Sequence, residues 1–285
     1  MGTTKNAMTD NIQTDQASLK VPHKTRNVFR KYVGALKELA SQSLYLSKTY
    51  APIDVFYSLF SKLNQSRTLH ARYQAQLAAF AKTKSTLNLS NDWFSNNIPY
   101  WLSVIDEYGL RSGNIKALEI GSWEGLSSYF ILSEIPNAHL TCVDTWEGAD
   151  EHKDGTAAPA IVLSKIEQTF DDNLSIFSSP LTKFKGTSLS FFSQNDVRCY
   201  YDFIYVDGSH HCNDVLLDAI KSFQMLKDGG IMVFDDYFWL HYPRAIDNPA
   251  AAINLFLRTK KDQYKIVKLY YQIIIVKTSD GYSEQ

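Results

Sequence analysis

The sequence has no hydrophobic run long enough to cross a membrane. Apolar stretches such as Ile231–Phe234 and Ile273–Val276 have the length of a β-strand, whereas a membrane-spanning helix needs about 20 consecutive apolar residues. Cysteine is also scarce, and Cys142, Cys199 and Cys212 form no Cys-X-X-Cys pair. The spacing therefore predicts neither a disulfide framework nor a zinc-finger site, and a reducing environment is expected.

The first ten residues lack the features of a targeting segment. Residues 1–10 are polar, without the apolar stretch of a secretory signal. Asn6 stands where the N-myristoylation pattern requires serine or threonine. We therefore expect a cytoplasmic protein. With 45% hydrophobic and 21% charged residues, the 285-residue chain has a globular composition and is long enough for one large domain or for a domain with an appendage.

Charge is distributed unevenly along the chain. Residues 1–90 carry 13 lysine and arginine residues and four acidic residues, a net charge of +9. The remaining residues carry 16 basic and 26 acidic residues, a net charge of −10. A basic face that docks on the acidic remainder explains this split, and so does contact with an anionic lipid surface or a phosphorylated carrier. No recognised nucleic-acid-binding motif is present, so nucleic acid is not an expected partner.

The N-terminal ninety residues have a helical pattern. Apolar residues recur at intervals of three and four residues in successive stretches from Val28 to Phe80. We predict a disordered segment over residues 1–20, because these residues have little to bury. A basic helical extension is expected over residues 21–90, followed by the main domain over residues 91–285.

From residue 115 onward, apolar runs of strand length alternate with helical patterns. Repeated strand–helix units predict an α/β fold, a doubly wound and mostly parallel sheet covered on both faces by helices. In such a sheet, ligands bind beyond the carboxyl ends of the strands. The expected strands are Ile115–Ile120, Ala138–Val143, Phe203–Val206, Ile231–Phe234 and Ile273–Val276, and helices are expected near residues 98–108, 127–132, 161–169, 215–226 and 250–257.

The first predicted strand runs into a glycine-containing loop. Gly121 lets the chain turn tightly beside a ligand, and Gly125 permits close packing of the following helix. The loop lacks the Gly-X-Gly-X-X-Gly pattern that brings a helix onto a pyrophosphate, which argues against NAD or FAD. The loop alone is explained equally well as a structural turn. The second strand ends in Asp144, an acid placed to accept hydrogen bonds from two ribose hydroxyls, so the two features together indicate a nucleoside ligand without a diphosphate.

Acidic side chains follow two later strands. Asp207 and His210 come directly after one strand, and Asp235 and Asp236 follow the next. If these strands are neighbours, three carboxylates meet and repel one another unless a cation binds or their pKa values rise. Hard carboxylate oxygens suit Mg²⁺. A single acid at a strand end is more often a cap or turn residue, and a single histidine is more often structural than catalytic.

Taken in order, these motifs resemble those of class I S-adenosylmethionine (SAM) methyltransferases. The most similar subgroup is the metal-dependent O-methyltransferases, of the catechol type and of the type that methylates macrolide sugars. The resemblance spans residues 92–277 and implies a Rossmann-like fold with a seven-stranded sheet, whereas the preceding residues have no recognised counterpart. The motifs that carry it are Leu118–Ser128, Val143–Asp144, Gly186–Ser188, Val206–His210 and Phe234–Asp236.

The resemblance implies roles for individual residues. SAM would contact the loop after the first strand, the end of the second strand and a serine after the third. Three aspartates would hold Mg²⁺, and a histidine three residues after the first of them would be the general base. The implied cofactor-binding residues are Glu119, Gly121, Ser122, Trp123, Ser127, Asp144, Thr145, Trp146, Ser188 and Asp207, the implied metal ligands are Asp207, Asp235 and Asp236, and the implied catalytic residues are His210 and Asp207.

The implied activity is methyl transfer from SAM to a hydroxyl group of a sugar, a glycan or a phenolic small molecule. Two positions depart from the subgroup: Asp236 stands where catechol-type enzymes often carry asparagine, and Thr187 where an acid is common. Three alternatives stay open: a metal-independent SAM methyltransferase of another acceptor, a SAM-binding module without activity, and a protein that docks on a lipid or carrier. By analogy with this fold type, a homo-oligomer is expected.

Two further segments are expected beside the site. The polar segment 147–159 follows the second strand and is predicted to act as a lid over the cofactor. The aromatic run Tyr237–Tyr242 follows the last acid and is predicted to form a wall near the metal. Aromatic side chains suit a sugar face and a phenolic ring equally, so this wall does not identify the acceptor.

Overall fold

The computed structural model describes residues 23–61, 65–149, 152, 160–178 and 180–279. Its contacts divide the chain into residues 1–42 and residues 43–285. The described part of the first unit is helical and belongs to α1 (His23–Lys48), which continues past the division. The predicted disordered segment and most of the predicted lid lie outside the described residues.

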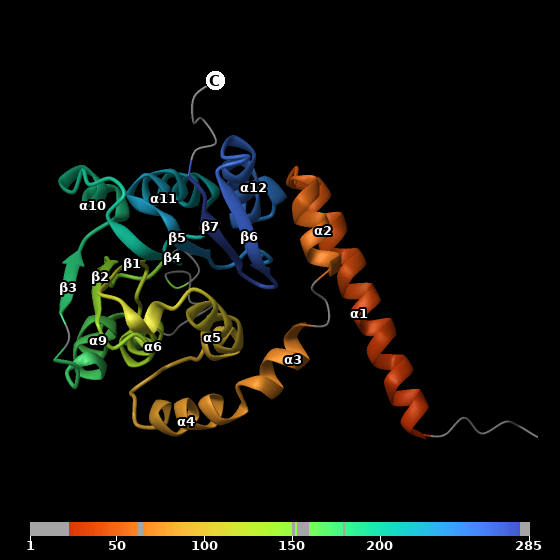
Figure 1. Cartoon of the computed structure of the whole chain (residues 1–285), viewed down its shortest axis with the longest axis horizontal. Helices are drawn as coiled ribbons and strands as arrows, with labels where there is room; N and C mark the ends of the chain where they lie inside the picture. The colour runs from red at the N-terminus through yellow and green to blue at the C-terminus, as the bar shows by residue number, and fades with distance from the viewer. Residues whose placement is uncertain (1–22, 62–64, 150–151, 153–159, 179, 280–285) are drawn as a thin grey trace, which may run out of the picture. The chain divides into compact units, whose positions relative to one another are not determined.

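A single sheet organises the second unit. Its strands lie in the order β3-β2-β1-β4-β5-β7-β6, visible in Figure 1. All neighbouring pairs are parallel except β5–β7 and β6–β7, which confirms the predicted mostly parallel, doubly wound α/β fold. The strands in the described residues are β1 (Ile115–Ile120), β2 (Ala138–Asp144), β3 (Leu181–Lys185), β4 (Tyr201–Val206), β5 (Leu226–Phe234), β6 (Tyr264–Leu269) and β7 (Ile273–Lys277).

The strand order reverses at β1. This strand pairs with β2 on one side and with β4 on the other, so the chain runs outward in both directions from the β1–β4 junction. In open α/β sheets, ligands bind in the crevice beyond the carboxyl ends of the strands at such a junction. The predicted loop after β1 and the predicted acids after β4 both lie there.

Helices cover both faces of the sheet. α5, α6 and α9 pack on one face, and α10, α11 and α12 pack on the other (Figure 1). Trp101 of α5 illustrates the first interface, because its ring meets Phe130 of α6 and Phe203 of β4 edge to face. The six helices are α5 (Ile98–Glu107), α6 (Leu126–Glu134), α9 (Ile166–Leu174), α10 (Ser188–Gln194), α11 (Cys212–Met225) and α12 (Pro249–Thr259), and the short helix α8 (Ala160–Leu163) precedes α9.

Residues 43–90 pack as part of the unit that contains the sheet. They include α2 (Ile53–Ser61), α3 (Gln65–Arg72) and α4 (Gln74–Lys84). The Tyr73 hydroxyl donates to Asp106 of α5 at 2.9 Å, and the Phe80 ring lies 5.3 Å from that of Phe130. The compact unit begins at Ser43 and includes part of the segment 21–90 that was described from the sequence as a basic helical extension.

Two strands and one helix had not been located in the sequence. β3 and β6 are the edge strands, and each carries lysines among its apolar residues. Lysine on an edge strand hinders pairing with another chain, and it also obscures the apolar run that marks the central strands. α10 is a short, serine-rich helix. Among the described residues, no helix combines the length and apolar character that a bilayer span requires.

Candidate active site

The loops after β1 and β4 touch through their backbones. Gly121 has a φ of +84°, and a Cβ atom on it would lie 1.8 Å from the carbonyl oxygen of Asp207. Any side chain at residue 121 would therefore collide with the main chain that presents Asp207. The predicted cofactor loop and the predicted metal loop are thus adjacent at the point where the strand order reverses.

Asp144 orients the loop after β1. One of its carboxylate oxygens accepts hydrogen bonds from the backbone N–H groups of Ser122 and Trp123, at 2.7 and 2.9 Å. The other accepts from the N–H of Trp146 at 2.6 Å. A carboxylate has about four acceptor sites, so Asp144 keeps capacity for further donors, and its expected contact with ribose hydroxyls stays a prediction.

Glu119 lies beneath the loop. Its side chain is fully buried, and one oxygen accepts from the hydroxyls of Ser122, at 2.8 Å, and Ser128. The other oxygen has no hydrogen-bond partner among the described residues. Burial raises the pKa of this carboxyl above its usual range. Glu119 therefore supports the loop from inside the protein.

The other predicted cofactor residues are distributed around this loop. Ser127 is buried in the first turn of α6, and Thr145 is half-buried after β2. The Trp123 ring stacks on His152 at 4.3 Å. Trp146 is buried, with its ring 5.0 Å from Phe170 and its indole N–H donating to the Trp123 carbonyl.

Ser188, the predicted adenine contact, is half-buried at the start of α10. The preceding Thr187 caps this helix, since its hydroxyl oxygen accepts the N–H of Ser190 at 3.1 Å. The Ser188 hydroxyl also contacts Asp218 of α11, which is almost fully buried and has one oxygen without a partner. Thr187 therefore has a local structural role.

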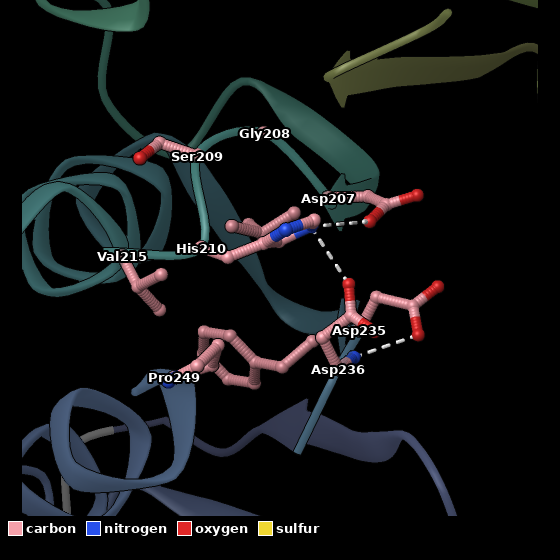
Figure 2. Close-up of a pocket in the computed structure, with 10 residues that line it drawn as sticks. Asp207, Gly208, Ser209, His210, Val215, Asp235, Asp236 and Pro249 are labelled. Carbon is pink, nitrogen blue, oxygen red and sulfur yellow. Dashed lines mark hydrogen bonds and ion pairs between the residues drawn. The ribbon is translucent and has the colours of Figure 1, made fainter. Parts of the chain in front are cut away.

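Three of the predicted catalytic and metal-binding residues converge beyond β4 and β5. The parallel register pairs Val206 with Phe234, so the acids that follow these residues come side by side. His210 Nε2 lies 2.8 Å from Asp236 Oδ2 and 3.9 Å from Asp207 Oδ1. Figure 2 shows the imidazole between the two carboxylates. Asp207, His210 and Asp236 each offer one ligand atom, and these three atoms lie within 4.8 Å of one another.

Asp235 has a different surrounding. Its Oδ2 accepts the hydroxyl of Tyr205 and the amide N–H of Gln272, the latter at 2.6 Å. Its Oδ1 accepts the backbone N–H of Asp236 at 2.7 Å. Asp236, with a φ of +56°, turns its carboxylate toward His210 instead. The structure thus groups His210 with Asp207 and Asp236, while Asp235 is directed toward Tyr205 and Gln272.

Burial and the repulsion of neighbouring carboxylates raise the pKa values of Asp207 and Asp235. Burial raises the pKa of Asp207 to about 6, with Asp236 adding to the rise and His210 opposing it. Burial, followed by the negative charges of Asp207 and Asp236, raises the pKa of Asp235 well above its usual range. A divalent cation offsets such repulsion. The donor set, two carboxylates and an imidazole with a third carboxylate adjacent, fits such an ion.

Tyr205, Tyr271 and Gln272 belong to the site but were absent from the sequence prediction. Tyr205 lies two residues before Asp207. Because alternate residues along a strand point to the same face of a sheet, the sequence could have indicated that these two side chains lie together. The Tyr271 hydroxyl donates to Asp236 at 2.9 Å. Both Tyr271 and Gln272 lie in the turn between β6 and β7, where the local sequence carries no sign of a site.

Part of the predicted aromatic wall borders the cluster. The Trp239 ring lies 4.6 Å from the His210 ring and stacks on His241 at 5.2 Å. Tyr242 packs edge to face against His241. Tyr237, in contrast, is fully buried, and its hydroxyl donates to Asn254 of α12 at 2.6 Å. The first residue of the run is therefore part of the core, and the later aromatics lie beside His210.

The comparisons with known proteins agree with this arrangement. A family model described as a methyltransferase domain matches residues 118–237, which include both loops and the acid cluster. No curated protein matches the sequence. Similar solved structures include a protein of Corynebacterium glutamicum (15% identity, 75% of this chain and 92% of that chain, TM-score 0.45) and a putative caffeoyl-CoA O-methyltransferase of Staphylococcus aureus (15%, 75% and 99%, TM-score 0.47).

A third solved structure is MycE, a methyltransferase from the mycinamycin biosynthetic pathway, crystallised with Mg, SAH and mycinamycin VI. The identity is 15% and the TM-score 0.47 over 76% of this chain, but only 56% of MycE is covered. Residues 118–237 thus match a methyltransferase domain, and the order and direction of the strands are those of a doubly wound α/β sheet.

Proposed function

We propose that this protein is a metal-dependent SAM O-methyltransferase that methylates a hydroxyl group of a sugar, a glycan or a phenolic small molecule. The observation that carries the proposal is the convergence of Asp207, His210 and Asp236 within 4.8 Å. This cluster adjoins the loop after β1, where Gly121 meets the backbone of Asp207. A base and a set of hard ligands therefore lie next to the predicted cofactor loop.

The proposed metal ligands are Asp207, Asp235 and Asp236, and the proposed ion is Mg²⁺. Carboxylate oxygens are the ligands that Mg²⁺ prefers. When bound, such an ion lowers the pKa of an acceptor hydroxyl and fixes its position. The raised pKa values of Asp207 and Asp235 support the proposal, because they reflect burial and the repulsion of neighbouring carboxylates, which a bound cation would relieve.

The remaining tasks fall to the protein's own side chains. Methyl transfer from a sulfonium to oxygen is an in-line displacement, so alignment and deprotonation of the acceptor dominate. A neutral imidazole at His210 would take the acceptor's proton. Asp236 Oδ2 lies 2.8 Å from Nε2 of this ring, and the Trp239 ring packs beside it. The backbone of Ser122 and Trp123, fixed by Asp144, orients the loop that would hold the cofactor.

A chelator experiment tests the proposal. The protein is treated with EDTA, dialysed, and assayed with SAM against a panel of catechols and hexosides, with and without added Mg²⁺ or Mn²⁺. We expect methyl transfer that disappears in EDTA and returns with metal. Full activity in EDTA would instead indicate a metal-independent enzyme, and SAM binding without transfer to any acceptor would favour a non-catalytic SAM-binding module.

We also propose that the basic N-terminal residues contact an anionic surface or carrier. The excess of 13 basic over four acidic residues before residue 91 supports this proposal. Several large apolar side chains of the same stretch are exposed, among them Tyr50, Ile53 and Tyr57. Basic charge next to exposed aromatics is typical of segments that bind membrane surfaces.

A further inference from the structure

A buried hydrogen-bond network lies beneath the acid cluster and begins at Gln272. This side chain is fully buried in the turn between β6 and β7. Its amide oxygen accepts the indole N–H of Trp101 at 2.7 Å and the hydroxyl of Tyr270. An indole N–H can only donate, so Trp101 requires an oxygen at this position.

The two donors therefore determine which way the amide of Gln272 points. With its oxygen directed at Trp101 and Tyr270, its nitrogen must face the opposite side, where Asp235 Oδ2 lies 2.6 Å away. The usual ambiguity between amide oxygen and nitrogen does not arise here. Gln272 consequently donates to Asp235 and keeps this oxygen as an acceptor.

Tyr205 completes the network from β4. Its hydroxyl donates toward Asp235 Oδ2 and lies 2.8 Å from Asp207 Oδ2. A phenol carries one proton, so this hydroxyl can donate to only one of the two carboxylates at a time. Because Tyr205 is almost fully buried in the sheet, its hydroxyl has little freedom to move. Tyr205 of β4 therefore helps to set the distance between the Asp207 and Asp235 carboxylates.

We propose that Gln272 and Tyr205 are positioning residues that hold the Asp235 and Asp207 carboxylates in the arrangement that binds the metal. The inference rests on the proposed metal-dependent function. Neither side chain takes a place in the ligand set, and both act through the carboxylates that they orient. Hydrogen-bond partners behind the ligands commonly change metal affinity about 10–100-fold. The network thus links α5 and the β6–β7 turn to the metal affinity of the site.

Mn²⁺ binding to the metal-free protein, followed by electron paramagnetic resonance, tests this role. The variants are Tyr205→Phe, which removes only the hydroxyl, and Gln272→Met, which keeps the chain length but removes the amide. We expect both to weaken Mn²⁺ binding about tenfold or more, while SAM affinity without metal is unchanged. High Mn²⁺ concentrations should restore their methyl transfer, which a purely structural defect would not permit.

Tyr73→Phe is the matched control. Tyr73 is also buried, and its hydroxyl also donates to an aspartate, Asp106, outside the acid cluster. We expect it to lower the melting temperature about as much as Tyr205→Phe does, with Mn²⁺ affinity unchanged. Wild-type Mn²⁺ affinity in Tyr205→Phe, or an equal loss in Tyr73→Phe, would overturn the role of the network. Absence of Mn²⁺ binding by the wild-type protein would overturn the metal site itself.

Discussion

One imidazole nitrogen of His210 faces the candidate site, and neighbouring groups determine where it points. Asp236 lies 2.8 Å from Nε2, and Trp239 packs against the ring. His211, the next residue, has a different task, because its Nδ1 accepts the N–H of Asn213 and caps α11. The two adjacent histidines thus have different surroundings, since His210 faces the acid cluster and His211 caps a helix.

Replacing His210 by alanine should separate turnover from cofactor binding. We expect kcat to fall about 10²–10⁴-fold, the usual contribution of a general base, with SAM affinity close to that of the wild type. Rapid-quench turnover and calorimetric SAM titration measure the two quantities. His211→Ala is the control and should cost stability rather than kcat. A His210→Ala protein with wild-type kcat would remove His210 from the mechanism.

Asp218 is a buried acid outside the metal cluster. Burial raises its pKa to about 7, far above that of an aspartate in an unfolded chain. The folded state therefore retains a proton that the unfolded state releases, and the free energy of unfolding falls as the pH rises from about 4 to about 7. Asp218→Asn removes this loss, which is on the order of a few kcal/mol.

Urea denaturation at pH 5 and pH 8 measures the effect. The stability of Asp218→Asn relative to the wild type should increase between the two pH values. The exposed Asp196 provides the comparison, and Asp196→Asn should show no such trend. If both variants behave alike, the side chain of Asp218 titrates normally and the burial argument fails.

From the sequence, Asp207 and His210 after one strand were predicted to lie near Asp235 and Asp236 after the next, because parallel strands that lie side by side end at one edge of the sheet. The sequence was insufficient for Gln272, which reaches Asp235 across 37 residues of chain. β7, the neighbour of β5, runs antiparallel to it. The carboxyl end of β7 therefore lies at the opposite edge of the sheet from the acids. The glutamine comes instead from the turn that precedes β7, and no local pattern distinguishes that turn from an ordinary one.

The strands differ in how easily they can be predicted from the sequence. The central strands β1, β4 and β5 are apolar because both of their faces are covered, so their positions could be predicted. The edge strands β3 and β6 alternate lysine with apolar residues, a pattern shared with exposed helices and loops. Lys183 also has a local structural role, since its ammonium pairs with Asp171 of α9 and lies over the Trp146 ring.

Two glycines with similar backbone angles should respond differently to alanine. Gly121 has a φ of +84° and no room for a Cβ atom, whereas Gly229 has a φ of +76° and nothing within 4 Å of that position. Gly229→Ala should cost about 1–2 kcal/mol of backbone strain. Gly121→Ala adds a backbone collision to the same strain and should cost considerably more.

Guanidinium unfolding of the two variants makes the comparison directly. SAM binding provides a second measure, because only the Gly121 substitution displaces the loop after β1. Equal losses of stability would show that the collision is relieved by a shift of the Asp207 loop. Such a shift should then appear as reduced Mn²⁺ affinity in Gly121→Ala alone.

The division of the chain does not follow its charge. The basic excess extends to about residue 90, but the compact unit begins at Ser43. Residues 43–90 join that unit through contacts such as those of Tyr73 and Phe80. Charge is a property of a segment's composition, while packing depends on a few large side chains, so the two divisions of the chain need not coincide.

Anionic vesicles should bind the full chain through its basic segment. We expect co-sedimentation with phosphatidylserine vesicles at low salt and release at high salt, because salt screens exposed charges. Replacement of Lys24, Arg26 and Lys37 by glutamine should weaken binding, whereas replacement of the exposed Lys261 and Lys265 should not. Binding that is insensitive to salt, or equal loss in both variants, would exclude this role for the basic segment.

The contact between Gly121 and the carbonyl of Asp207 bears on how the substrate specificity of the proposed enzyme could change. In the proposed enzyme, the distance from methyl donor to acceptor oxygen would depend on this contact between two main chains, in which no side chain at residue 121 takes part. Aromatic residues such as Trp239 and Tyr242 can then be exchanged to admit a new alcohol while the reach of the transfer stays constant. The choice of acceptor and the distance over which the methyl group moves would then depend on different residues.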